Sequence, residues 1–131
     1  MVLACGSCHE ALDRGPFYPA PAPNEGASEI EPAMLDHQWA TERLWEGVTG
    51  PWDNAWQRGA AALAETQVFG GQEPALTLSD DLRRREQELR EIGTKARRAK
   101  GLKERAALYG RLLSTCGGCH RAAGVTFEAT K

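Results

Sequence analysis

Two five-residue segments of the chain combine cysteine and histidine in the same order. Cys5-Gly6-Ser7-Cys8-His9 lies near the start, and Cys116-Gly117-Gly118-Cys119-His120 lies near the end. Two cysteines three residues apart lie on one side of a helical turn, where each can form a thioether with a vinyl group of haem. The adjacent histidine then supplies the proximal ligand of the iron. The two motifs predict two covalently bound c-type haems.

The repetition of the motif strengthens this interpretation, because all four cysteines and two of the three histidines belong to the two copies. A structural zinc site made from Cys5, Cys8, Cys116 and Cys119 is an alternative, since zinc accepts four thiolates. Its halves would be separated by the 107 residues 9–115, whereas compact zinc modules separate them by about 15 to 20. A redox dithiol is a further alternative, but no strand pattern flanks either motif. We therefore prefer the haem interpretation.

Composition places the chain among soluble globular domains, with 131 residues, 41% hydrophobic and 26% charged. No apolar run reaches the length of about 18 residues that a membrane span requires. Residues 1–80 carry 12 acidic and 3 basic side chains, whereas residues 81–131 carry 6 acidic and 13 basic. This polarity predicts docking to a charged partner or to a second copy, or else pairing of oppositely charged helices within the fold. Nucleic-acid binding is not expected, because the basic segment is interrupted by Glu86, Glu88, Glu91 and Glu104.

Turn-forming residues divide the chain into two parts. Residues 1–27 hold the first haem motif and a proline-rich arm, whose four prolines within residues 15–26 exclude a regular helix. Residues 28–131 hold four amphipathic helical patterns and the second motif. The expected boundaries are a cap at Ser28, a break at Gly50-Pro51, a connector over residues 69–74 followed by a cap at Ser79, and a break at Gly101.

The apolar positions of these patterns recur at helical spacing. The first pattern has a stripe of Ile30, Met34, His37, Thr41, Leu44 and Val48, and the fourth has one of Leu102, Ala106, Tyr109, Leu113 and Cys116. No strand signal of comparable strength is present. The sequence therefore predicts an all-α fold, an antiparallel four-helix bundle with an N-terminal haem-bearing extension.

A four-helix bundle with a haem motif near the end of its last helix resembles the class II c-type cytochromes, the family of cytochrome c-prime and its low-spin relatives. The resemblance covers residues 28–124 and depends on Cys116, Cys119 and His120. It implies that the residue on the far side of the haem comes from the first bundle helix, where Met34 matches that position. It also implies a homodimer formed through the first two bundle helices. The N-terminal motif departs from the family pattern.

His37 is the third histidine of the chain and lies on the predicted inner stripe of the first bundle helix. A lone histidine on an apolar face more often packs in the core than binds a metal, but a haem iron expected in the same core favours ligation. We therefore predict His37 as an axial ligand and Met34 as a second candidate, with core packing as the alternative role of Met34. The two residues are about 4.5 Å apart along the helix axis, so they would serve two different irons but not one.

These residues favour a dihaem c-type cytochrome that carries single electrons between redox partner proteins outside the cytoplasm. We expect a periplasmic location, with the export signal missing from this chain. The sequence contains no nucleophile elbow or phosphate loop, so we do not expect an enzyme. One alternative is a protein that binds nitric oxide or carbon monoxide at a five-coordinate iron. Another is a small peroxidase or reductase, which would need a distal acid–base group that the sequence does not identify.

Overall fold

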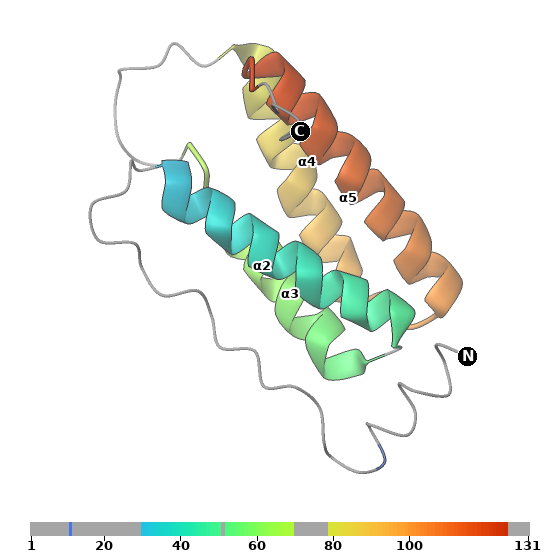
Figure 1. Ribbon diagram of the computed structural model, residues 1–131. Coiled ribbons are helices and arrows are strands. Elements are labelled where there is room, and N and C mark those ends of the chain that lie inside the picture. Colours follow the sequence, from blue (N-terminus) through green and yellow to red (C-terminus); the bar gives the residue numbers. More distant parts are fainter. Residues whose placement is uncertain (1–10, 12–29, 51, 70–78, 126–131) are drawn as a thin grey trace, which may run out of the picture.

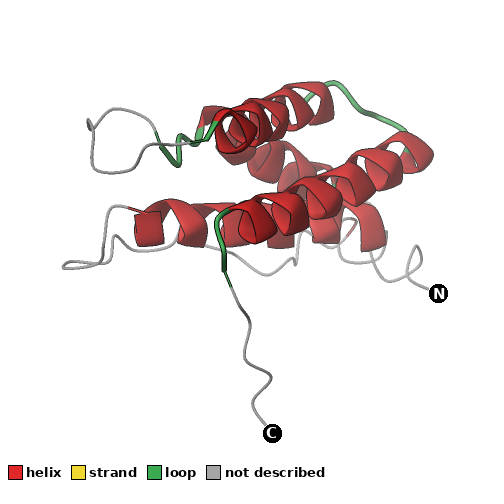
Figure 2. Cartoon of the chain, turned by 90° about the horizontal axis from the view of Figure 1, so that it is seen from above, coloured by secondary structure: helices red, strands yellow, loops and turns green. Residues whose placement is uncertain are grey.

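The computed structural model describes residues 11, 30–50, 52–69 and 79–125. It contains four helices in this part of the chain: α2 (Ile30–Thr49), α3 (Asp53–Glu65), α4 (Asp80–Ala96) and α5 (Leu102–Ala122). Figure 2 shows only helices and loops among the described residues, so the all-α prediction is confirmed. None of the described helices combines the length and hydropathy that crossing a membrane would require.

The helix boundaries follow the predicted breaks closely. Helix α2 ends at Thr49, directly before Gly50-Pro51. The hydroxyl of Ser79 accepts a hydrogen bond from the backbone N–H of Leu82 at 3.3 Å and so caps α4, as predicted. Gly101 is the N-cap residue of α5. The predicted cap at Ser28 lies outside the described residues.

The four helices form an up-and-down bundle. Helix α2 packs on α3, α3 on α4, α4 on α5, and α5 returns to α2 through the least extensive of the four interfaces. Figure 1 shows that the α2–α3 pair crosses the α4–α5 pair, and that the pairs lie apart at the end where α2 begins and α5 ends. The predicted antiparallel four-helix bundle is therefore confirmed for the described residues.

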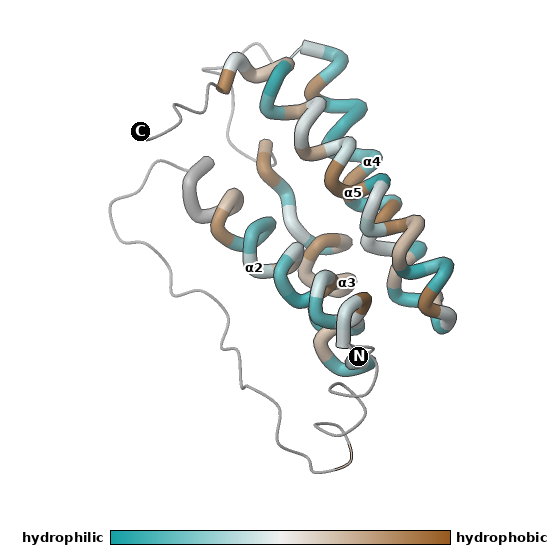
Figure 3. The backbone as a smooth tube through the Cα atoms, turned by 45° about the vertical axis from the view of Figure 1, so that its right-hand side comes forward, coloured by the Kyte–Doolittle hydropathy of each residue, from teal (hydrophilic) through white to brown (hydrophobic). Residues whose placement is uncertain are grey.

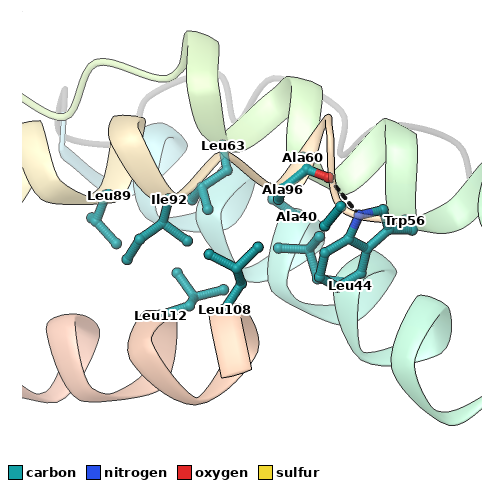
Figure 4. Packing of buried hydrophobic residues seen from close by; sticks show 11 residues of the cluster. Ala40, Leu44, Trp56, Ala60, Leu63, Leu89, Ile92, Ala96, Leu108 and Leu112 are labelled. Carbon is teal, nitrogen blue, oxygen red and sulfur yellow. Dashed lines mark hydrogen bonds between the residues drawn. The ribbon is translucent and has the colours of Figure 1, made fainter. Parts of the chain in front are cut away.

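A single apolar core lies toward the opposite end of the bundle. Its largest fully buried side chain is Trp56, which donates a hydrogen bond from Nε1 to the carbonyl oxygen of Ala96 at 2.7 Å (Figure 4). Its members come from all four helices and from the residues after α4: Ala40, Leu44, Trp56, Ala60, Leu63, Leu89, Ile92, Ala96, Ala99, Leu108 and Leu112. Burial of this apolar surface is the main favourable contribution to folding.

Two glycines permit the helices to approach closely around this core. A Cβ at Gly59 would lie 2.7 Å from the carbonyl oxygen of Ala40 in α2, and one at Gly93 would lie 2.5 Å from the backbone nitrogen of Ala64 in α3. Any larger residue at these positions would push backbone away from backbone. The α2–α3 and α3–α4 interfaces therefore depend on the absence of a side chain there.

Arg105 closes the bundle beside the core, although its side chain is charged. It is only 4% exposed. Its guanidinium lies 5.2 Å from the ring centroid of Trp56, and its Nη2 donates to Oδ1 of Asp53 at 2.5 Å. Its Nε also donates to the carbonyl oxygen of Ala99 at 3.3 Å. This arginine joins the start of α3 to the α4–α5 connection.

The buried face of α5 differs from its predicted apolar stripe. The residues of α5 that are buried are Arg105, Leu108, Leu112, Thr115 and Gly118, whereas Leu102 and Leu113 are 41% and 50% exposed. The prediction was wrong here because it counted only apolar side chains, and Arg105 and Thr115 mark the true inner face. Figure 3 shows the resulting mixture of hydrophobic and hydrophilic turns along α4 and α5.

The buried face of α2 also differs from its predicted stripe, and it is shifted in the same direction as the buried face of α5. Its buried residues include Ala40, Arg43 and Leu44, while Met34, His37, Thr41 and Val48 are half-buried. The stripe predicted for α2 therefore borders the core, and only Leu44 of its described members is fully inside. A helix in a four-helix bundle contacts two neighbours, so its buried arc is wider than one stripe.

Candidate functional site

The C-terminal motif lies on the last turns of α5. Cys116 and Cys119 are half-buried thiols, and neither forms a disulfide. His120 is half-buried and belongs to the last turn of the helix. Gly117 and Gly118 separate the cysteines without adding side chains of their own. Both thiols and the imidazole are thus presented within one and a half turns of the same helix, as the motif predicts.

The α2–α5 interface sets the level of His37 relative to this motif. The rings of Trp45 in α2 and Tyr109 in α5 lie against each other, with centroids 5.7 Å apart. From this contact, His37 lies about 12 Å along α2 toward its start. Because the helices are antiparallel, the same direction along α5 leads to Cys116 after about 10 Å and to His120 after about 16 Å. His37 and the motif therefore occupy the same level of the bundle.

The titration of His37 agrees with this placement. Burial lowers the pKa of His37, and the positive charge of His120 lowers it further, while Asp36 and Glu86 oppose the shift. A charge on α5 thus acts on an imidazole of α2 across the interface. The lowered pKa favours the neutral imidazole, which is the form that binds metals.

The two thiols differ in their surroundings. Burial raises the pKa of Cys116, and a charge on Cys119 raises it further. Burial also raises the pKa of Cys119, but the guanidinium of Arg85 opposes that shift. Burial therefore favours the protonated form of both thiols, but only Cys119 has the charged residues of α4 beside it.

Helix α4 contributes charged residues beside the motif that sequence analysis did not assign to the site. The guanidinium of Arg85 lies against Gly118, where a Cβ would come within 2.8 Å of its Cζ. Its Nε donates to Oδ2 of Asp81 at 2.8 Å. Glu86 accepts hydrogen bonds from the backbone N–H groups of Val68 and Phe69 at 2.7 and 3.1 Å.

The spacing of residues in α4 could have indicated a role for Arg85 and Glu86. Leu82, Arg85, Glu86 and Leu89 are spaced as one face of a helix, so the two charged residues share the stripe of two leucines. Charged residues on an otherwise apolar stripe either pair with each other or face something polar. Here Arg85 lies against Gly118 at the motif end of α5, while Glu86 accepts hydrogen bonds from the backbone that follows α3.

The motif end of the bundle lacks the packing found at the other end. Among the described residues, no apolar side chain is fully buried on α2 before Ala40, on α4 before Leu89 or on α5 after Leu112. The turns of α2, α4 and α5 at the motif end instead hold half-buried side chains, both polar ones and apolar ones such as Leu35 and Leu82.

The remaining predicted site residues have different outcomes. Met34 lies half-buried on α2, one turn before His37. Cys5, Cys8 and His9 lie outside the described residues, so their role stays a prediction. Within the described ranges, no three histidine, cysteine or acidic side chains are grouped as a metal site would need. The four-cysteine zinc alternative includes Cys5 and Cys8 and is therefore not decided.

Comparison with known proteins adds no relative. No protein-family model, no curated protein and no solved structure matches the chain.

Proposed function

We propose that this chain is a dihaem c-type cytochrome that carries single electrons between redox partner proteins outside the cytoplasm. The observation that carries the proposal is the placement of Cys116, Cys119 and His120 on one helix end, level with His37 on the facing helix. The first three are the residue types that attach a haem and bind its iron from one side. Burial lowers the pKa of His37 and so favours the neutral imidazole, the form that could bind the iron from the other side.

The surroundings of the motif support this assignment. On α2, α4 and α5, the turns at this end of the bundle carry no fully buried apolar side chain among the described residues. A haem attached there would cover apolar surface that the helices leave half-exposed. When bound, a haem supplies an iron that gains and loses one electron. Cys116 and Cys119 would hold the group covalently, and His120 would be its proximal ligand.

The arrangement also favours electron transfer over the gas-binding alternative. His37 and Met34 are both half-buried on α2 near the level of the motif, so each is a candidate for a second axial ligand. An iron with two protein ligands is suited to electron transfer rather than to binding small molecules. The class II cytochrome resemblance remains part of the proposal, as does the N-terminal motif with its second haem.

The test is the mass of the denatured chain after coexpression with a haem-attachment system and an export signal. Thioether bonds survive unfolding, so we expect the polypeptide mass plus two haem groups. Replacing Cys116 and Cys119 with alanine should remove one haem group, and replacing Cys5 and Cys8 should remove the other. A mass with one haem or none, or a chain that carries zinc, would overturn the proposal.

A further inference from the structure

An apolar face lies at the α2–α5 interface, where the rings of Trp45 and Tyr109 contact each other. It consists of Trp45 from α2 with Leu102, Tyr109 and Leu113 from α5, and we call it the aromatic face. Trp45 is 54% exposed, Leu113 is 50% exposed and Leu102 is 41% exposed. These are three of the four large apolar side chains that the described residues expose to this degree. Exposed apolar side chains gathered on one surface mark an interaction site more often than single ones do.

The shape of this face suits an extended chain. The indole of Trp45 and the ring of Tyr109 are tilted by 41° with centroids 5.7 Å apart, so they present a pair of ring surfaces. Gly110 and Ala106 lie beside Tyr109 on α5 and are both exposed. A Cβ at Gly110 would meet nothing within 4 Å. The rings therefore stand beside a strip of small residues.

The chain itself contains a segment of matching chemistry. Within residues 15–23, prolines occur at 16, 19, 21 and 23, and Phe17 and Tyr18 separate the first two. Prolines at this density favour the polyproline II conformation, which is already extended and loses little entropy when it binds. Paired aromatic rings are the surface on which such segments dock, and the P-x-x-P spacing of Pro16 and Pro19 is the usual ligand pattern.

The length of chain before α2 allows this contact. Trp45 lies 15 residues after Ile30, which is about 22 Å along the helix axis. In a polyproline II conformation, the seven residues from Ile30 back to Pro23 span about 22 Å, and the eleven back to Pro19 span about 34 Å. Residues 19–23 can therefore reach Trp45 by running antiparallel to α2, without strain on the helix.

We propose that residues 15–23 dock on the aromatic face of the same chain. Trp45 and Tyr109 receive the prolines, while Phe17 and Tyr18 continue toward Leu102. This contact ties the segment that precedes α2 to the side of the bundle along which Cys116 lies. The inference is independent of haem binding, because none of the contact residues belongs to either cysteine motif.

The test places a photo-crosslinking benzoylphenylalanine at the position of Ala20, between Pro19 and Pro21, in the full chain. After irradiation and trypsin digestion, we expect cross-links within one chain to the peptides that contain Trp45 or Tyr109. Trp45→Ala should lower their yield several-fold, as should glycine at Pro19 and Pro21. Trp39→Ala is the matched control, because Trp39 is on the same helix but lies against Arg43 and Arg58 on another side.

Each other outcome overturns the proposal. Cross-links between two chains would assign the face to a second copy. Cross-links to α3 or α4, or none at all, would show that the segment does not reach the face. An unchanged yield in Trp45→Ala would show that the rings do not bind it. Circular dichroism of each variant establishes that the bundle is folded before yields are compared.

Discussion

The indole Nε1 of Trp56 donates a 2.7 Å hydrogen bond to the carbonyl oxygen of Ala96. This bond joins the first turn of α3 to the last residue of α4. It satisfies a carbonyl at a helix end that is buried among apolar side chains. The same indole contacts Arg105, so one side chain connects α3, α4 and α5.

Trp56→Phe tests this connection. Phenylalanine keeps most of the apolar contact but removes the indole donor, and the Ala96 carbonyl keeps only the 3.1 Å bond from the N–H of Ala99. We therefore expect a loss of about 0.5–1.5 kcal/mol in the free energy of unfolding, the net contribution of one hydrogen bond. Urea unfolding followed by circular dichroism measures it. Trp45→Phe is the control on an exposed ring and should change stability by less than about 0.5 kcal/mol. Equal effects of the two variants would contradict the role assigned to Trp56.

Alanine substitutions at Gly93 and Gly110 should change the stability of the chain in opposite directions. Alanine favours a helix interior over glycine by about 1 kcal/mol, so Gly110→Ala should stabilise the chain by up to that amount. Gly93→Ala should destabilise it despite the same gain, because the added Cβ would lie 2.5 Å from the backbone nitrogen of Ala64. Thermal unfolding of both variants decides the question. A stabilising Gly93→Ala would mean that α3 and α4 approach less closely than described.

His37→Ala tests the axial-ligand prediction. If His37 binds iron opposite a motif histidine, its loss should turn one low-spin haem high-spin and open it to carbon monoxide, with the other haem unchanged. His37→Met should keep that haem low-spin but raise its potential, because thioether ligation favours the reduced iron. Optical spectra of the reduced protein with and without carbon monoxide report both effects. If His37→Ala keeps the parent spectrum, His37 is a packing residue and Met34 becomes the leading ligand candidate.

The contribution of Asp81 to the free energy of unfolding should depend on pH in the acidic range. A hydrogen bond from Arg85 is the largest cause that holds the pKa of Asp81 below its ordinary value of 3.8, and Arg84 acts in the same direction. A carboxyl with a lowered folded-state pKa binds fewer protons when folded, so its stabilisation is complete above that ordinary value and is lost as pH falls through the lowered one. The stability difference between the parent and Asp81→Asn should therefore be constant near neutral pH and shrink below pH 3.8.

The control for this prediction removes the partners. With Arg84 and Arg85 both replaced by glutamine, the difference between aspartate and asparagine at position 81 should lose its acid dependence. Salt should weaken the effect in the parent, because Arg84 is well exposed. An acid dependence that survives the loss of both arginines would assign the shift to another cause.

Local breaks of helical structure could be predicted from the sequence, and packing faces could not. Gly50-Pro51, Ser79 and Gly101 act through backbone geometry and capping within a few residues, so they predicted the ends of α2 and the starts of α4 and α5. The inner face of α5 depends on Arg105, whose burial requires Asp53 and Trp56 from a distant part of the chain. Such a partner cannot be recognised from one helix alone.

The candidate site could likewise be predicted from the sequence only in part. Cys116, Cys119 and His120 are adjacent in sequence, so their chemistry could be proposed from spacing. The role of Arg85 at the candidate site depends on how α4 packs against Gly118. The spacing of residues within either helix does not specify that packing. His37 could be proposed because helical periodicity places it on the side of α2 that borders α5. Its level relative to the motif became clear only with the contact between Trp45 and Tyr109.

The uneven core gives the two ends of α5 different opening free energies. Leu108 and Leu112 sit in the apolar cluster, so their amide protons should exchange with solvent only when the bundle unfolds globally. The turns around Cys119 and His120 have no such anchor, and their amides should exchange through local fraying. The chain can thus release its last turns transiently while α3 and α4 stay packed. Its thiols then become reachable for covalent chemistry after the bundle has folded, and a group bound there would suppress the fraying.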